Sequence, residues 1–234
     1  MTTLDVVRLA ERAMAATEQE DWAADTFLNA SSLQLNEAEG TGVEWHPLVP
    51  FLPRNTRVLF LGSFPPQRKR WCMDFFYPNF INDHWRIEGL VFHQAADHFV
   101  DTAQKTFRLQ AIVRHLKQHG IGFFDTALAV KRLEDNASDK HLEVVVPTDI
   151  RVLTAQLPEL RAIVTTGEKA TMTIMAAMDV REGNDKLRLP GVNTSTALPL
   201  HGVELYRLPS SSRAYPMALQ KKAEAYGKMF RRYL

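Results

Sequence analysis

The sequence predicts an α/β protein, a three-layer α/β/α sandwich around a central, mostly parallel sheet of four strands. Two observations predict this fold. Short apolar runs, typical of strands buried on both faces, alternate with longer segments that have the spacing of helices. In addition, the run Leu59–Gly62 leads straight into a turn with Ser63, Pro65 and Pro66, the kind of strand-to-loop junction at which α/β sheets place ligands.

The beginning of the chain differs from the rest. Residues 1–44 are predicted to be an acidic helical extension and linker, and residues 45–234 to be one domain. Within the extension, helical spacing runs from Leu4 to Ala15, and a polar linker runs from Asn29 to Gly42.

Charge is distributed unevenly. Residues 1–46 contain nine acidic and two basic residues, a net charge of −7, whereas the whole chain has +1. The remainder therefore has +8, which favours an anionic partner. No apolar run approaches the roughly 18 residues that span a membrane, and Asp5 and Glu11 in the first amphipathic segment argue against a secretory signal. We therefore expect a cytoplasmic protein without a membrane partner.

The expected elements follow in chain order. The four strands are Arg57–Gly62, Ile121–Thr126, Ala162–Thr166 and Val203–Leu208. The helices are Phe107–His119 (closed by Gly120), Asp149–Leu157, Gly167–Met178 and Pro216–Tyr233.

Three loops follow these strands, namely Gly62–Trp85, Asp125–Asp139 and Pro209–Tyr215. Parallel strands end at the same edge of a sheet, so the loops are expected to meet there. The first loop has a basic run, Arg68–Arg70, and then an aromatic cluster that either belongs to the core or stacks on a base. Its two asparagines, Asn79 and Asn82, can hydrogen-bond a base edge or position a water.

The other loops carry further candidates with two interpretations each. Asp125 is either a general base or an acceptor for loop amides. The serines Ser210, Ser211 and Ser212 precede a basic helix, and they either cap that helix or bind phosphate.

Several kinds of site are disfavoured. Cys72 is the only cysteine, which excludes an internal disulfide, an iron–sulfur cluster and a multi-cysteine zinc site, and it has no signature of a nucleophile. His84 and His201 lack the spacing of metal ligands, and the segment at Gly167 lacks a nucleotide-binding glycine pattern. We therefore expect no metal and no cofactor.

The loops together resemble the motifs of the uracil-DNA glycosylase superfamily, most closely its hypoxanthine-DNA glycosylase branch. Leu59–Pro66 is similar to Leu-x-Leu-Gly-Ser-Phe-Pro-Gly, with Pro66 replacing the last glycine, and Gly120–Asp125 matches Gly-Ile-x-aromatic-aromatic-Asp. Leu208–Tyr215 is similar to Leu-Pro-Ser-x-Ser-Pro-Ala-Asn, with Arg213 in place of proline and Tyr215 in place of asparagine. The resemblance covers residues 45–234 and is specific only through the combination of motifs.

One motif is ambiguous. The family has an aromatic-His-Pro-x-Asn-x-x-Trp stretch, and Tyr77–Trp85 is two residues longer between proline and tryptophan. Counting back from Trp85 selects Asn82 as the functional asparagine, whereas counting forward from Pro78 points nearer Asn79.

The resemblance implies a monofunctional DNA glycosylase of base-excision repair. Such an enzyme flips a deaminated base, uracil or hypoxanthine, out of double-stranded DNA and hydrolyses its N-glycosidic bond. The expected partner is double-stranded DNA with a damaged base, with single-stranded DNA left open, and the expected state is a monomer. It implies a base pocket formed by Gly62, Ser63, Phe64, Pro65, Phe76 and Tyr77. With Asp125, the asparagines Asn82 and Asn79 are the expected catalytic residues, and the expected DNA contacts are Ser210, Ser211, Ser212, Arg213, Lys221 and Lys222.

Departures from the family leave alternatives open. Classical uracil glycosylases have an aspartate in the first motif and a histidine at the start of the last; here the Ser63 region and Leu208 stand in those places. The chain is then a slow or purine-directed enzyme, or an inactive relative that binds DNA or damaged bases. A hydrolase or nucleoside-processing enzyme for small substrates is a third alternative, which would leave the basic last helix without a role.

Overall fold

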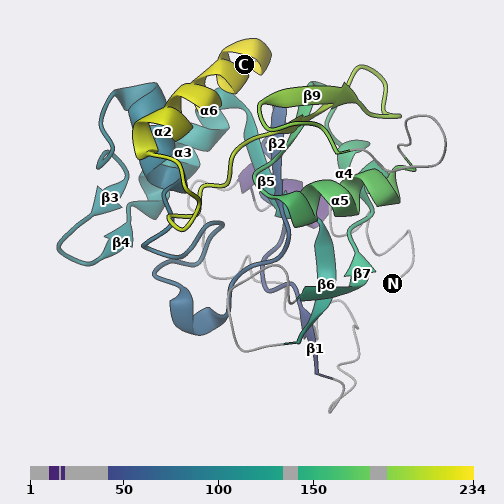
Figure 1. Ribbon diagram of the computed structural model, residues 1–234, viewed down its shortest axis with the longest axis horizontal. Coiled ribbons are helices and arrows are strands. Elements are labelled where there is room, and N and C mark those ends of the chain that lie inside the picture. Colours follow the sequence, from purple (N-terminus) through teal and green to yellow (C-terminus); the bar gives the residue numbers. More distant parts are fainter. Residues whose placement is uncertain (1–10, 16, 19–41, 134–141, 180–188) are drawn as a thin grey trace.

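The computed structural model describes residues 11–15, 17–18, 42–133, 142–179 and 189–234. At its centre lies a five-stranded sheet with the order β5-β2-β8-β10-β9 (Figure 1). These strands are β2 (Val58–Gly62), β5 (Ile121–Asp125), β8 (Ala162–Thr165), β9 (Thr194–Ala197) and β10 (Glu204–Arg207).

The four predicted strands are all present and mutually parallel, which confirms an α/β fold. The predicted strand number is wrong, because β9 adds a fifth strand that runs antiparallel to β10. This strand, Thr194–Ala197, lies at the edge of the sheet and is only half-buried or exposed, so it lacks the apolar run by which a central strand is recognised.

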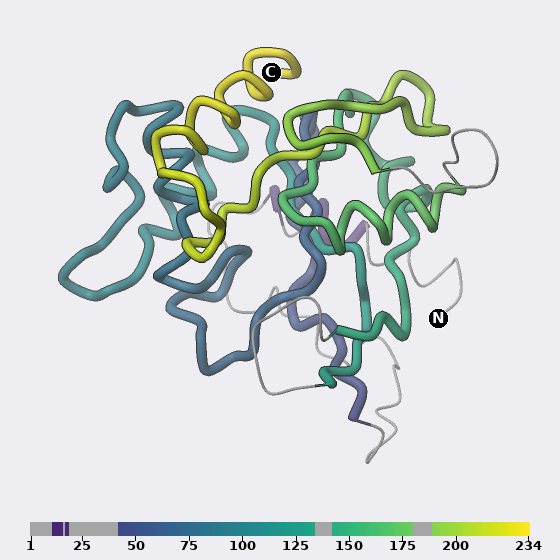
Figure 2. Tube along the Cα trace, in the orientation of Figure 1, coloured from purple at the N-terminus to yellow at the C-terminus, as the bar shows by residue number. Residues whose placement is uncertain are grey.

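Helices cover both faces of this sheet (Figure 1). On one side lie α2, α3 and α6, and on the other α4 and α5. Their bounds are α2 His84–His93, α3 Leu109–His119, α4 Ile150–Thr154, α5 Glu168–Ala177 and α6 Leu219–Tyr233. All but α2 were predicted, and Figure 2 shows the last helix returning to lie beside α2, with which it packs.

Local signals explain two of these helix ends. Gly120 closes α3 with a φ of 66°, the left-handed conformation that glycine adopts without strain. Asp149 caps α4, since its side chain accepts a hydrogen bond from the backbone N–H of Val152.

A second, antiparallel sheet was not predicted. It has the order β1-β6-β7, with β1 Val43–Trp45, β6 Ala127–Arg132 and β7 Leu142–Pro147. The predicted loop 125–139 is therefore wrong over its first half, because only Thr126 separates β5 from β6. The polar segment 136–139 lies outside the described residues. A short hairpin, β3 (Val100–Asp101) with β4 (Thr106–Phe107), and the 3-10 helix η3 (Arg68–Arg70) complete the structure.

The described part of the N-terminal extension packs against the domain. Residues 11–15 are helical, as predicted, and Ala13 is fully buried in the core. The Thr17 hydroxyl donates to the Ala13 carbonyl and accepts a hydrogen bond from the backbone N–H of Leu52. The rest of the predicted helix and the predicted linker up to residue 41 lie outside the described residues.

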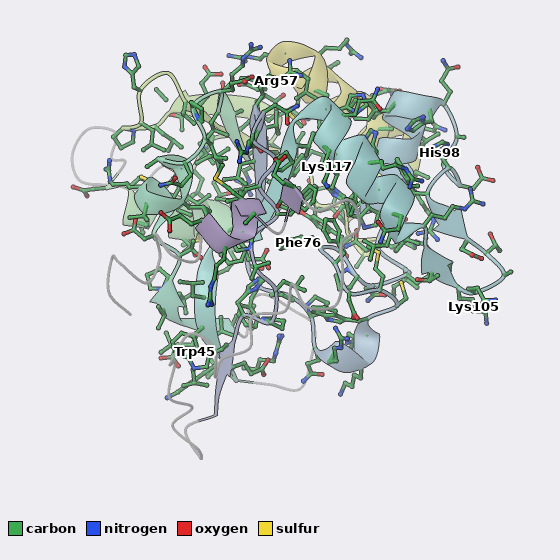
Figure 3. The ribbon with its side chains drawn as sticks, turned by 180° about the vertical axis from the view of Figure 1, so that it is seen from behind. Trp45, Arg57, Phe76, His98, Lys105 and Lys117 are labelled. Carbon is green, nitrogen blue, oxygen red and sulfur yellow. The ribbon has the colours of Figure 1, made fainter. Side chains whose placement is uncertain are left out.

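One apolar core joins the central sheet to its helices. Phe60 on β2 and Phe123 on β5 stack with centroids 5.1 Å apart, and Phe76 stacks on Phe123 at 5.8 Å. Seen from behind, Phe76 lies in the middle of the molecule, between Trp45 at one end and Arg57 at the other (Figure 3). Within the described residues, no helix is both long and apolar enough to cross a lipid bilayer.

Candidate functional site

The carboxyl ends of the parallel strands bring the sequence motifs together. Gly62 at the end of β2 is paired in register with Asp125 at the end of β5, and Leu61 with Thr165 on β8. Beyond the strands, the backbone N–H of Leu208 donates to the Thr165 carbonyl. The motifs at Gly62, Asp125 and Leu208 therefore share one edge of the sheet, as predicted.

Asp125 lies at the centre of this edge. Asp125 is buried, and its carboxylate oxygen Oδ2 lies 2.9 Å from Nε2 of His46. The other oxygen, Oδ1, occupies the space beside Gly62, where a Cβ atom would approach it to 2.3 Å. A glycine at position 62 is thus required for the carboxylate to lie where it does.

The turn after Gly62 is fixed by Arg132 on β6. The guanidinium donates to the Pro65 carbonyl at 2.6 Å and lies over the Phe64 ring, 5.6 Å from its centroid. Phe64 and Pro65 are buried, whereas Ser63 is half-buried. This turn is therefore anchored beside Asp125, and its role as a wall of a base pocket stays a prediction.

The aromatic candidates separate into two kinds. Phe76 is a core residue, 4% exposed and packed on Phe123 and Phe124, so the core interpretation describes it. Tyr77 is half-buried, and its hydroxyl lies 2.9 Å from the Thr166 hydroxyl, just beyond β8. Its backbone has a φ of 49°, a left-handed conformation that costs about 1–2 kcal/mol in a residue other than glycine.

Beneath Tyr77 lies a buried acid–base cluster. Glu88 on α2 is fully buried, and its two oxygens lie 3.0 Å from Nε2 of His84 and of His115. Burial raises the pKa of Glu88, but hydrogen bonds from His115 and His84 outweigh it and lower the pKa from 4.5 to about 2. The carboxylate is therefore ionised at neutral pH.

The two asparagines are engaged in turns of the backbone. Asn79 Oδ1 accepts from the N–H of Ile81 at 3.1 Å, and Asn82 Oδ1 accepts from the N–H of His84 at 2.9 Å. Both residues are half-buried. The hydrogen bond to His84 places Asn82 at the start of α2. The ring of the same His84 stacks on the Tyr77 ring.

Asp83 ties the first loop to the serine loop. Its N–H donates to the Ser211 carbonyl, and its carboxylate lies 3.3 Å from Lys222 Nζ and 3.1 Å from Arg213 Nε. Lys222 is 1% exposed and also donates to the Ser212 carbonyl at 2.8 Å. Lys222 thus faces the interior, where Asp83 and the Ser212 carbonyl occupy its ammonium, and this burial argues against the predicted contact with DNA phosphate.

The serines behave differently from one another. Ser211 is buried, with 2% exposure, and lies under the loop beside Tyr226. Ser210 and Ser212 are half-buried and accept hydrogen bonds from the N–H groups of Ser212 and Ala214. The α6 helix has Ala218 as its N-cap without a side-chain hydrogen bond, so none of the three serines caps it.

The remaining candidates are not assembled into a site. Burial raises the pKa of the Cys72 thiol, which donates to the Pro78 carbonyl and is thus not activated as a thiolate. Among the residues that the structure describes, no three His, Cys, Asp or Glu side chains are grouped so as to hold a metal ion.

Comparisons with known proteins bear on the fold. No protein-family model matches the chain, and no curated protein is significantly similar to it. Among solved structures it is similar to a Methanosarcina acetivorans protein, solved by solution NMR and provisionally assigned as a uracil DNA glycosylase. The TM-score is 0.51 and the identity 23%, over 82% of this chain and 98% of the other. The two proteins share a fold. The predicted glycosylase-like architecture is confirmed at that level, and the hypoxanthine branch stays a prediction.

Sequence reasoning missed several residues that organise the site. None of the three was singled out from the sequence: His46 at the start of the predicted domain, Asp83 and Glu88. A charged residue in a loop or on a helix gives no sequence signal of burial. The position of His46 next to Pro47, shortly before the first central strand, is the only sequence feature that draws attention to it. The contact with Asp125 could not be predicted, because the two residues are 79 positions apart.

Proposed function

We propose that the protein is a monofunctional DNA glycosylase that removes a deaminated base, uracil or hypoxanthine, from DNA. The observation that supports this most directly is the buried carboxylate of Asp125 beside Gly62, at the sheet edge where the Asn79–Asn82 loop and the Ser210–Arg213 loop also meet. The shared fold with a protein assigned to this activity supports the same proposal.

The proposed chemistry is hydrolysis at C1′ of the flipped nucleotide. The C1′–N bond breaks and its electron pair leaves with the base, while the water oxygen bonds to C1′ and gives its proton to a carboxylate. Asp125 accepts that proton or stabilises the positive charge that develops on the sugar. Asn82, with Asn79 as the second candidate, orients the water or contacts the base, and Tyr77 offers a stacking face.

DNA contact is assigned to the exposed cations and the half-buried serines. Arg213 and Lys221 are exposed, and Ser210 and Ser212 are half-buried in the loop that leads from β10 toward α6. Lysine and arginine contacts to phosphate weaken with salt and do not depend on sequence, so we expect binding to undamaged duplex that falls as salt is raised.

The test is cleavage of labelled duplexes that contain uracil, hypoxanthine, xanthine or a G·T mismatch, with alkali to break abasic sites. Matched undamaged duplex is the control. Asn82→Ala and Asn79→Ala are compared with the wild type, and we expect Asn82→Ala to abolish cleavage and retain salt-dependent binding. Cleavage that survives in Asn82→Ala but not in Asn79→Ala reassigns the role. Intact duplexes throughout, with normal binding, would support a non-catalytic DNA-binding protein instead.

A further inference from the structure

His46 is built into the wall of the site from three directions. Its side chain has no exposed surface. The ring packs against Phe124, with centroids 4.6 Å apart, and against the edge of Phe64 at 5.4 Å. Its own backbone N–H donates to the Leu128 carbonyl on β6 at 2.8 Å. The ring therefore has no freedom to turn away from Asp125.

Hydrogen-bond partners restrict where its protons lie. An ionised carboxylate can only accept, so the 2.9 Å contact between Nε2 and Asp125 Oδ2 requires a proton on Nε2. On the other side, Nδ1 has the Leu48 carbonyl at 2.8 Å as an acceptor and the Leu48 N–H at 3.2 Å as a donor. The ring can therefore be neutral or protonated, and in both forms Nε2–H donates to Asp125 and Nδ1 has a partner.

The consequence falls on the second oxygen of Asp125. Because Oδ2 is held by His46, Oδ1 is the oxygen left for other work, and it lies beside Gly62. The backbone around it is also tied, since the Thr148 hydroxyl donates to the Asp125 carbonyl at 2.7 Å. One oxygen is thus anchored and the other is directed to the end of β2.

We propose that His46 is a positioning residue for Asp125, holding its Oδ2 so that Oδ1 is directed at the reacting sugar and water. This inference rests on the proposed function. Two further charged residues lie at the Phe64 turn: Arg132, over the Phe64 ring at 5.6 Å from its centroid, and Glu44, which pairs with Arg132 at 2.9 Å. Those two charges pair with each other, whereas the His46 ring is hydrogen-bonded directly to the Asp125 carboxylate.

The first test measures cleavage against pH. His46→Phe keeps the packing but removes the donor, which leaves Oδ2 buried without a partner and disfavours the ionised form. We expect the acid limb of kcat to move up by about one pH unit or more, a tenfold loss at a fixed pH on that limb, with KM and DNA affinity unchanged. His46→Gln, which retains an N–H donor, should recover part of the loss. Circular dichroism shows whether each variant is folded, and a folded His46→Phe with the wild-type pH profile overturns the proposal.

The second test does not need activity. Nitrogen NMR of histidine-labelled wild type should show His46 Nε2 protonated from pH 5 to pH 8. In Asp125→Asn the amide can donate to Nε2, so we expect the proton to move to Nδ1. An unprotonated Nε2 in the wild type overturns the pairing, even in an active enzyme. The predicted spectra in a protein that cleaves no duplex would instead retain the pairing and refute only the proposed function.

Discussion

Tyr77 lies flat on His84, with ring centroids 3.8 Å apart and ring planes parallel. The stack joins the exposed loop to the buried Glu88 cluster, because His84 is also held by Glu88. Its cost is visible in the backbone, where Tyr77 has a φ of 49°. The ring contact is therefore strong enough to hold a tyrosine in a conformation that favours glycine.

The strain at Tyr77 is tested with two truncations. Tyr77→Ala and Tyr77→Gly lose the same ring, but only the glycine relieves the positive φ. We expect both to be less stable than wild type, with the glycine variant as stable as the alanine variant or up to about 1 kcal/mol more stable. Urea unfolding measures the difference, and Tyr77→Phe, which keeps the ring but loses the hydrogen bond to Thr166, is the control. If the alanine variant is clearly more stable than the glycine variant, the positive φ at position 77 does not strain the backbone.

Lowering the pH should reduce the stability of the protein over two pH ranges. Burial lowers the pKa of His93 and of His119, so the folded state resists their protonation and stability is lost as pH falls below 6.5. The pKa of Glu88 is also depressed, from 4.5 to about 2, so its contribution is present above pH 4.5 and is lost between pH 4.5 and 2.

The variant Glu88→Gln tests whether Glu88 causes the loss of stability between pH 4.5 and pH 2. The shift corresponds to roughly 3 kcal/mol at neutral pH, and the variant should lose about that much there. The gap between variant and wild type should then narrow as pH falls from 4.5 toward 2. Thermal melts across this range measure it, and a gap that stays constant with pH would assign the acid sensitivity to other groups.

Gly62→Ala should disturb Asp125 directly. The added Cβ would lie 2.3 Å from Oδ1, so the carboxylate must move and its bond to His46 must weaken. We expect a stability loss of about 1–3 kcal/mol and, under the proposed function, loss of cleavage. Gly191→Ala is the matched control, because its Cβ would make only ordinary contacts near 3.5 Å with Thr194. A Gly62→Ala enzyme with unchanged cleavage would show that the position of Oδ1 is unimportant.

Asp83 should matter more for Lys222 than for Arg213. Asp83→Asn leaves a buried ammonium without a counter-charge, at a cost of about 3–5 kcal/mol. Arg213→Ala removes an exposed guanidinium and leaves Asp83 paired with Lys222, at a cost of about 1 kcal/mol or less. Adding Lys222→Met to Asp83→Asn should restore most of the stability. Denaturant unfolding of the four variants of this cycle measures the coupling. Additive single effects would show that the pair is not coupled.

Arg213→Ala serves a second purpose. Because its effect on folding should be small, any loss of duplex binding can be assigned to contact with DNA. We expect weaker binding with a lower salt dependence, measured by fluorescence anisotropy at several salt concentrations. Unchanged binding would remove Arg213 from the proposed DNA surface.

The parallel strands could be predicted because burial on both faces leaves a local mark, as in Leu59–Gly62 and Ile121–Asp125. The second sheet left no such mark. Its strand β7 alternates buried or half-buried with exposed positions, and β6 follows β5 with no Gly, Pro or Asn between them to indicate a turn. Helix α2 was missed because Gly89 lies in its interior, where glycine is unfavourable. That glycine is required by packing, since a Cβ would lie 2.4 Å from the Ala95 carbonyl.

The site was predicted in part for the same reason. The motif residues Gly62 and Asp125 and the serine loop are found at one edge, since parallel strands dictate it. Which side chains face inward was not predictable: Lys222 and Ser211 are buried although both are polar, because their partners Asp83 and Tyr226 come from other parts of the chain.

The direct connection from β5 to β6 also affects when the region around Asp125 forms during folding. Asp125 ends β5 and Thr126 leads directly into β6, which pairs with β1 at residues 43–45. The carboxylate is therefore fixed only when segments about eighty residues apart have met in both sheets, and such contacts of high sequence separation form slowly. On refolding, we expect the Asp125–His46 pair to form after the helices, so that cleavage, under the proposed function, returns later than the helical structure.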